Sequence, residues 1–225
     1  ALGTDLGSDE NNDFSFTGGD GGVNLDVGDQ SGANENTVEI TTGSGEDTIS
    51  ITADVATNSD SETFELSTGD GDDTLVVASG GPHTVGSAGD GSSIDFGDGN
   101  NTLDLSSAAG GDDLGQVSIS NLDTIVNSGN NATVNADGMN EQAVTINDFG
   151  SSTLTLQLTG NNDLDDLSNF ATTGLDNLTI TGNTTGTGDG GSNTIDVSTV
   201  GTDFGVADDN VAINGGAGDD EITGN

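Results

Sequence analysis

The stretch that decides the fold is FELSTGDGDDTLVV, at positions 64–77. On both sides of its centre, apolar side chains alternate with threonine, serine and acidic residues, which is the pattern of half-buried β-strands. The centre itself combines glycine with aspartate, the residues that favour tight turns. The stretch therefore predicts a strand, a glycine-aspartate turn and a second strand.

The same unit occurs three more times, as FSFTGGDGGVNLDV at 14–27, VEITTGSGEDTISI at 38–51 and IDFGDGNNTLDL at 94–105. The equivalent glycines lie 24, 26 and 28 residues apart, at Gly21, Gly45, Gly71 and Gly99. Each unit is too small to bury its own apolar face, so this period indicates stacked coils. We predict an all-β chain that forms a parallel β-helix, or β-solenoid, of irregular coils.

The middle of the chain differs, because between residues 121 and 183 asparagine pairs (Asn130-Asn131 and Asn161-Asn162) replace the acidic turns. They could form an inward asparagine ladder or ordinary turns, and we favour turns. A β-sandwich-like middle part is an alternative to continuous coils. We divide the chain into acidic-turn coils at 1–110, Asn/Thr-rich β repeats at 111–186 and a return of acidic turns at 187–225. The ends, Ala1 and a turn motif that normally continues, suggest a segment of a longer or processed protein.

The charge of the chain is extreme: 225 residues contain 40 Asp and Glu but no Lys or Arg, for a formal net charge of -40. With only 29% hydrophobic residues, such a chain repels itself unless cations from solution neutralise it. We therefore expect folding that depends on ions. Without cysteine, disulfides and thiolate metal sites are excluded. The charge also argues against nucleic acid as a partner, and no apolar run is long enough for membrane insertion.

The sequence GGAGDDEIT at 215–223 fits the calcium-binding nonapeptide GGxGxDxUx, where U is apolar, at every specified position. Its glycines allow positive φ, which turns carbonyl oxygens inward, and its aspartate adds an anionic oxygen. Ca²⁺ accepts about six to eight such oxygens in flexible geometry, whereas Mg²⁺ demands a tighter octahedron. Turns at 42–49 and 68–75 come close to the motif. The candidate Ca²⁺-binding residues are Gly43, Gly45, Asp47, Gly69, Asp70, Gly71, Asp73, Asp98, Asn101, Gly215, Gly216, Gly218 and Asp220.

Among these residues we expect Asp47, Asp73 and Asp220 to be carboxylate ligands, with Asp70 and Asp98 as reinforcement. Asn101 stands where an aspartate is expected, which predicts a weaker site there. Two alternatives remain open. Asp-Gly and Asn-Gly dipeptides form turns without any ion, and acidic surfaces can simply hold water and salt, as in halophilic proteins.

We expect no enzyme activity. His83 has no second histidine or cysteine to complete a transition-metal site. Carboxylate pairs such as Asp112-Asp113 or Asp165-Asp166 could serve as the acid and base of a glycosidase. Carbohydrate enzymes usually add aromatic platforms to such a pair, and this chain has seven phenylalanines but no tryptophan or tyrosine.

With the nonapeptide at 215–223, the chain resembles secreted bacterial RTX proteins. The segments SISNLDTI at 118–125 and LDNLTI at 175–180 are similar to the strands between RTX turns in some bacterial surface-layer (S-layer) proteins. The resemblance implies export through a type I pathway without an N-terminal signal, an extracellular location and folding where calcium is plentiful.

These observations predict a non-enzymatic extracellular structural protein whose acidic turns bind Ca²⁺ to fold and assemble a surface layer, matrix or filament. We expect self-association, with a cell-surface polysaccharide as a further candidate partner. One alternative is a calcium-dependent ligand-binding or spacer module of a large RTX adhesin. Another is a halophilic acidic surface protein stabilised by salt rather than calcium.

Overall fold

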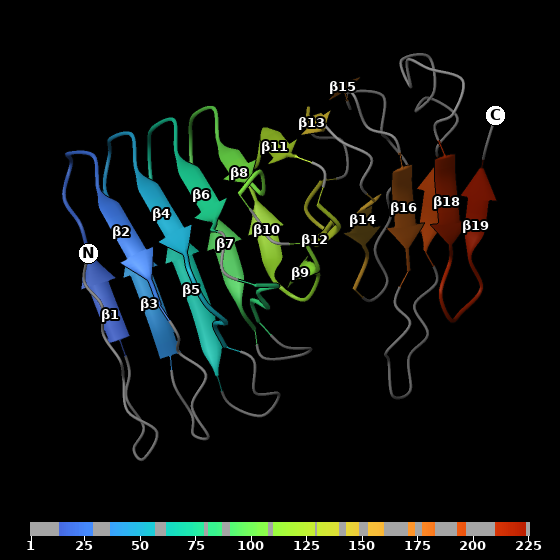
Figure 1. Ribbon diagram of the computed structural model, residues 1–225, viewed down its shortest axis with the longest axis horizontal. Helices are drawn as coiled ribbons and strands as arrows, with labels where there is room; N and C mark the ends of the chain where they lie inside the picture. The colour runs from blue at the N-terminus through green and yellow to red at the C-terminus, as the bar shows by residue number, and fades with distance from the viewer. Residues whose placement is uncertain are drawn as a thin grey trace.

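The computed structural model describes residues 14–28, 37–56, 62–78, 81–86, 91–107, 110–128, 130–139, 143–148, 153–159, 171–173, 177–182, 193–196 and 210–223. Within these residues every strand pair is parallel, and successive coils stack along one axis (Figure 1). The predicted all-β parallel solenoid is therefore confirmed. No helix in the described part is long and apolar enough to cross a membrane.

The strands form four parallel sheets. Sheet A contains β1 (Phe14–Thr17), β3 (Thr37–Thr41), β5 (Thr63–Ser67), β7 (Ser93–Asp95) and β10 (Ser118–Ser120). Sheet B contains β2 (Asn24–Val27), β4 (Thr48–Ile51), β6 (Thr74–Val77), β8 (Thr102–Asp104), β11 (Thr124–Asn127), β13 (Thr145–Asp148) and β15 (Ala171–Thr173). Sheet C contains β9 (Asp112–Leu114), β12 (Ala132–Asn135), β14 (Thr153–Gln157), β16 (Asn177–Thr181) and β18 (Asn210–Asn214). Sheet D pairs β17 (Thr194–Asp196) with β19 (Glu221–Thr223).

The four acidic repeats connect sheet A to sheet B through turns of equal length. Each turn has six residues between its strands, at 18–23, 42–47, 68–73 and 96–101. Equal length lets the turns stack in one row, which is visible at the edge of the solenoid (Figure 1). The unequal repeat spacing therefore arises in the remainder of each coil and leaves the turns in register.

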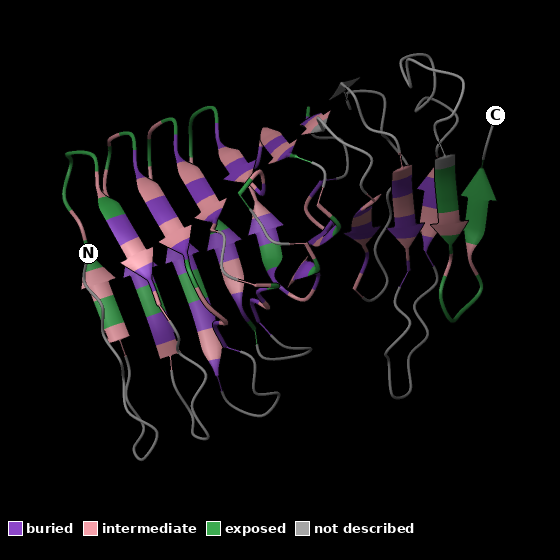
Figure 2. Cartoon of the chain, viewed as in Figure 1, coloured by how far each residue is buried: buried purple, intermediate pink, exposed green. Residues whose placement is uncertain are grey.

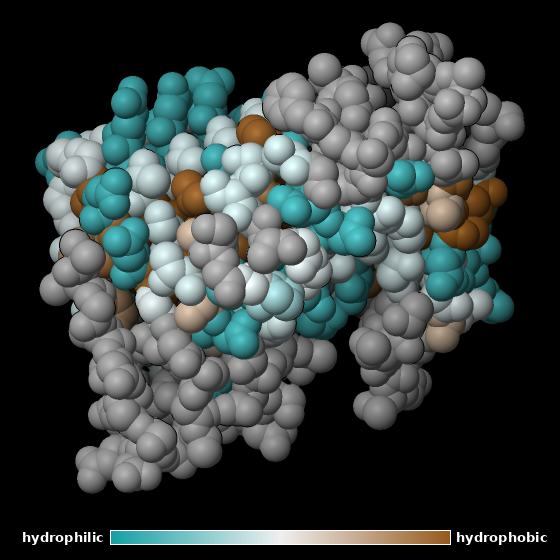
Figure 3. All heavy atoms as spheres, in the orientation of Figure 1, coloured by the Kyte–Doolittle hydropathy of each residue, from teal (hydrophilic) through white to brown (hydrophobic). Residues whose placement is uncertain are grey.

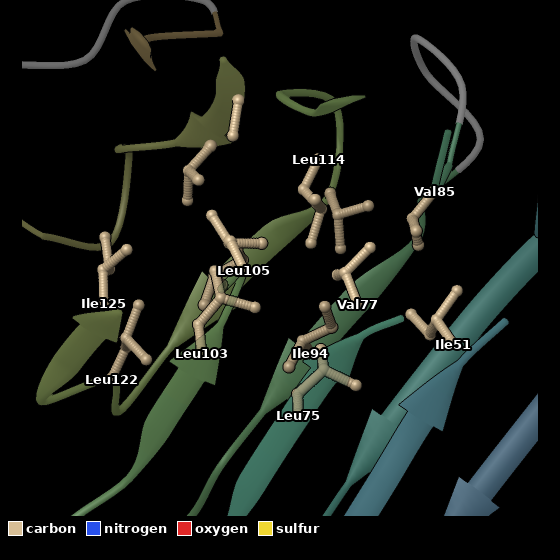
Figure 4. Packing of buried hydrophobic residues seen from close by; sticks show 14 of the residues in the cluster. Ile51, Leu75, Val77, Val85, Ile94, Leu103, Leu105, Leu114, Leu122 and Ile125 are labelled. Atoms are coloured by element: carbon tan, nitrogen blue, oxygen red, sulfur yellow. The ribbon is translucent and has the colours of Figure 1, made fainter. Parts of the chain in front are cut away.

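The core consists of apolar residues that are buried at every second strand position, as the alternation predicted, and Figure 2 shows this alternation of burial along the strands. Strand register places like residues above one another, as in the column Leu25, Ile49, Leu75, Leu103 and Ile125. All five are buried, and Figure 4 shows the packing around Leu75 and Leu103. Fully burying one such side chain contributes about 1.5–3 kcal/mol. The few apolar residues of the chain are thus concentrated at the inward strand positions.

The described part of the middle of the chain continues the same solenoid and is not a sandwich. Strand β11 pairs in parallel with β8 on one side and with β13 on the other, so sheet B runs across residue 110. Isolated parallel bridges, Val55 with Val85 and Thr84 with Asp113, lie beside β9 on the N-terminal side.

Candidate cation sites in the turn column

The glycines of the turns allow successive coils to approach closely. At Gly97, whose φ is 71°, an added Cβ would overlap the carbonyl oxygen of Gly69 on the preceding coil. At Gly45, the backbone is outside the left-handed region, but a Cβ would lie only 2.9 Å from the backbone nitrogen of Gly22. Glycine is therefore required by backbone conformation at some positions and by close packing at others.

One residue of each turn, immediately before the sheet B strand, lies in a column that we call the turn column. From the N-terminal side its members are Val23, Asp47, Asp73, Asn101 and Asp123. In each polar member a side-chain oxygen accepts a hydrogen bond from the backbone N–H of the preceding member. The N···O distances are 2.6 Å for Asp47, 2.8 Å for Asp73, 3.1 Å for Asn101 and 2.8 Å for Asp123.

Asp47 and Asp73 are buried, with 1% and 0% of their surface exposed. Their Oδ1 atoms accept the column hydrogen bonds, but their Oδ2 atoms are buried and have no hydrogen-bond partner among the described residues. A buried carboxylate is stable only when it is protonated, paired with a cation or bound to a metal. These two oxygens are therefore the strongest candidates for cation ligands in the column.

The hydrogen bonds of Asn101 show which groups surround a side chain in the turn column. Its Oδ1 accepts from Asp73 N, while its Nδ2 donates to the carbonyl oxygens of Gly97 (3.4 Å) and Asn121 (3.0 Å). Asn193 likewise donates from Nδ2 to the carbonyl oxygen of Gly215 on the next coil, at 3.2 Å. Backbone oxygens thus line the position next to Oδ1.

An aspartate in this position replaces the amide donors by a second negative oxygen. Around Asn101 the acceptors are the carbonyl oxygens of Gly97 and Asn121. Strand register shows that the equivalent carbonyl groups for Asp73 are those of Gly69 and Phe96. A carboxylate among carbonyl oxygens is the donor set that Ca²⁺ prefers. The residues at Asp47 and Asp73 therefore fit this ion.

Two buried threonines belong to the same region, although sequence reasoning did not select them. The Thr42 hydroxyl donates to the carbonyl oxygen of Thr68 (2.7 Å), and the Thr68 hydroxyl donates to that of Phe96 (2.8 Å). They stand where the nonapeptide has its first glycine. The hydroxyl bonds to the next coil explain why threonine suits this position in a stacked turn.

Asp70 and Asp98 lie on the outside of the turns. Both are exposed and are joined by a parallel β-bridge. Figure 3 shows that hydrophilic residues gather over the turns. The structure does not bring these two aspartates together with Asp73 in a cluster, because no group of three or more His, Cys, Asp or Glu side chains that could hold a metal occurs in the described ranges. A site in this column would combine one buried carboxylate with backbone oxygens.

The nonapeptide at 215–223 repeats part of this geometry at another corner of the solenoid. Gly216 and Gly218 have φ values of 88° and 135°, close to those of Gly69 and Gly71. Asp220 is half-buried, and its Oδ1 accepts from the backbone nitrogen of Asn193 on the preceding coil at 3.0 Å. Asp220 thus makes the same hydrogen bond as Asp73.

The asparagine pair at 130–131 lies in the connection between β11 and β12, and Asn131 is exposed, so this residue does not belong to an inward ladder. Asn127 donates from Nδ2 to the carbonyl oxygen of Asn130 (2.8 Å), and Asn131 Oδ1 accepts from Thr153 N (2.9 Å). The pair at 161–162 lies outside the described residues.

Asp95, at the end of β7, gives a direct test of acid sensitivity. Its burial raises the pKa, but hydrogen bonds from the Asn121 side chain (2.7 Å), from Gly97 N (3.1 Å) and from Ser120 prevail, so the pKa lies below its ordinary value. A lowered folded-state pKa contributes stability above the unfolded value of about 3.9, and this contribution is lost as the pH falls through the folded pKa.

We expect Asn121→Ala to move the pKa of Asp95 upward, toward its ordinary value, because the hydrogen bond from the Asn121 side chain to its carboxylate is lost. Carboxyl-carbon NMR titration measures this shift. Asn100→Ala is the matched control, since Asn100 bonds Asp72 instead. An Asp95 pKa that moves equally in both variants would contradict the assignment.

No protein-family model, no curated protein and no solved structure matches this chain. Function is therefore inferred from the residues and their geometry.

Proposed function

We propose that this protein is a non-enzymatic, extracellular structural solenoid of the RTX type, which binds Ca²⁺ in its turn column and assembles into a surface layer, matrix or filament. The observation that supports this most is that the buried Oδ2 atoms of Asp47 and Asp73 have no hydrogen-bond partner among the described residues. They occur in a chain of net charge -40 that has no lysine or arginine to neutralise them.

Bound Ca²⁺ would neutralise these carboxylates and accept backbone oxygens as further ligands. The residues of the chain supply the anionic ligands and hold neighbouring turns together. Asp47 and Asp73 supply the anionic oxygens, and the glycine stack allows neighbouring turns to approach. Thr42 and Thr68 tie each turn to the next through their hydroxyl groups.

Folding and ion binding are coupled in this proposal. Stacking places equivalent carboxylates on neighbouring strands about 4.8 Å apart, where their repulsion opposes the folded state. Cations that bind only the stacked turns shift the equilibrium toward folding. Low calcium would leave the chain unfolded, and calcium-rich surroundings would fold it.

Assembly is supported by the distribution of charge over the faces. On sheet A, Glu39 and Glu65 are exposed on adjacent strands. On sheet C, the outward side chains of β14 and β16 are uncharged: Thr153, Thr155, Gln157, Asn177, Thr179 and Thr181. Contact between two polyanionic copies, or with a neutral polysaccharide, costs least on such a face. Near the C-terminal end, the apolar side chains of Val211 and Ile222 are exposed.

Titration of calcium into chelator-treated protein tests the proposal, with far-UV circular dichroism for folding and light scattering for assembly. We expect a coil-to-β transition with calcium that magnesium and sodium chloride do not reproduce. At a hundredfold excess over the dissociation constant, each site adds about 2.7 kcal/mol to folding.

The outcomes separate the alternatives. Scattering that rises with folding supports assembly, whereas a calcium-loaded monomer favours the adhesin spacer. Folding in chelator, or equal folding with sodium, would leave a halophilic acidic protein.

A further inference from the structure

A third buried carboxylate lies outside the turn column, at the first residue of β9. Asp112 is 1% exposed, and its Oδ1 accepts a hydrogen bond from the backbone nitrogen of His83 at 2.8 Å. Its Oδ2 is buried without a hydrogen-bond partner in the described part of the chain. Asp112 thus has the same one-sided hydrogen bonding as Asp47 and Asp73.

The backbone that precedes Asp112 also resembles the acidic turns. Gly110 and Gly111 have φ values of 87° and 89°, and Gly111 N donates to the carbonyl oxygen of Asn131 on the next coil at 2.6 Å. Left-handed glycines therefore lead directly into an inward aspartate at the start of a strand. The sequence GGDDL at 110–114 lacks the nonapeptide spacing, so the motif does not assign this residue.

The chain itself does not neutralise Asp112. The sequence contains no Lys or Arg, and the one histidine, His83, places its Nε2 3.2 Å from the carbonyl oxygen of Ala78. His83 reaches the Asp112 carboxylate through its backbone N–H. A dissolved cation can supply the positive charge that the side chains of this sequence lack.

We propose that Asp112 is an additional binding site for a hard divalent cation of the calcium class, separate from the nonapeptide turns. Asp112 pairs with Ala132 in sheet C, while its neighbour Asp113 bridges to Thr84 on the N-terminal side. A cation here stabilises the junction between the 81–86 segment and β9. The proposal rests on Asp112 alone and does not require calcium at Asp47 or Asp73.

Carboxyl-carbon NMR of the full chain, during titration of chelator-treated protein with calcium chloride at pH 7, tests the site directly. We expect the Asp112 carboxyl signal to move with calcium. In isothermal titration calorimetry, Asp112→Asn should bind one calcium ion fewer than the wild type, because the amide keeps the bond to His83 N but removes the charge. Asp113→Asn, on the adjacent outward position, should keep the full stoichiometry.

An Asp112 signal that does not respond to calcium, or that reports a protonated carboxyl at saturating calcium, overturns the proposal. The wild-type NMR result decides even where Asp112→Asn does not fold. Failure of the proposed function is distinguishable, since it appears at the Asp47 and Asp73 signals. A response at those two residues without one at Asp112 overturns only the additional site.

Discussion

Gly97→Ala is expected to unfold the acidic coils, or to leave them far less stable, even with saturating calcium. The added Cβ would overlap the Gly69 carbonyl oxygen, and that atom belongs to a stacked backbone that cannot move aside independently. Gly97 also has a φ of 71°, and this left-handed conformation costs a residue with a Cβ about 1–2 kcal/mol. Together these terms place the loss of unfolding free energy above about 4 kcal/mol.

Urea denaturation followed by circular dichroism measures this loss, and Gly19→Ala is its matched control. Gly19 occupies the equivalent position in the first described turn, and a Cβ there would have no atom within 4 Å. The control should change stability by no more than about 0.5 kcal/mol. Equal destabilisation by both variants would mean that the turns do not stack as described.

The double variant Asp47→Asn/Asp73→Asn is expected to need less calcium for folding. Each amide would keep the hydrogen bond that Oδ1 now accepts and would present Nδ2 to the carbonyl oxygens, as Asn101 does. Removing an uncompensated buried charge should raise the stability in chelator by about 3 kcal/mol or more per site. The two effects need not add, because Asp73 bonds the backbone of Asp47.

Circular dichroism in chelator measures the stability of the calcium-free protein, and titration calorimetry measures the number of calcium ions bound. We expect the double variant to retain β structure in chelator and to bind two calcium ions fewer. Asn101→Asp is the reverse test, and it should add one ion and destabilise the chelator-treated protein. A double variant that loses stability in chelator while binding the same number of ions would show that these aspartates are not ligands.

Much of the fold could be predicted from local patterns. Alternation around residues 64–77 predicted the strands, and a repeat in the twenties predicted stacked coils, because neither property depends on distant contacts. The sandwich-like alternative for the middle part could not be excluded in this way. Its strands alternate like those of a sandwich, and only their pairing with β8 and β9 distinguishes the two.

The site was predictable only in part. Glycine and aspartate at 68–73 indicated a calcium turn, but the pattern could not tell that Asp73 lies inside while Asp70 lies outside. Asn101 stays predicted as a weaker ligand, and only the structure shows that its side chain bonds backbone groups on both sides. The threonine hydroxyls were missed because their acceptors belong to the next coil.

By itself, the sequence predicted a β-solenoid from its apolar alternation and its repeat period, and it showed that the chain has no lysine or arginine to neutralise its 40 acidic residues. Among the described residues, the tertiary structure alone decided which buried carboxylate oxygens are left without a hydrogen-bond partner. Asp112 illustrates the reason, because its only described hydrogen-bond donor, His83 N, lies 29 residues earlier in the chain. In a solenoid each buried polar group is satisfied or left unsatisfied by the coil before or after it, and the register of those coils is a property of the folded chain.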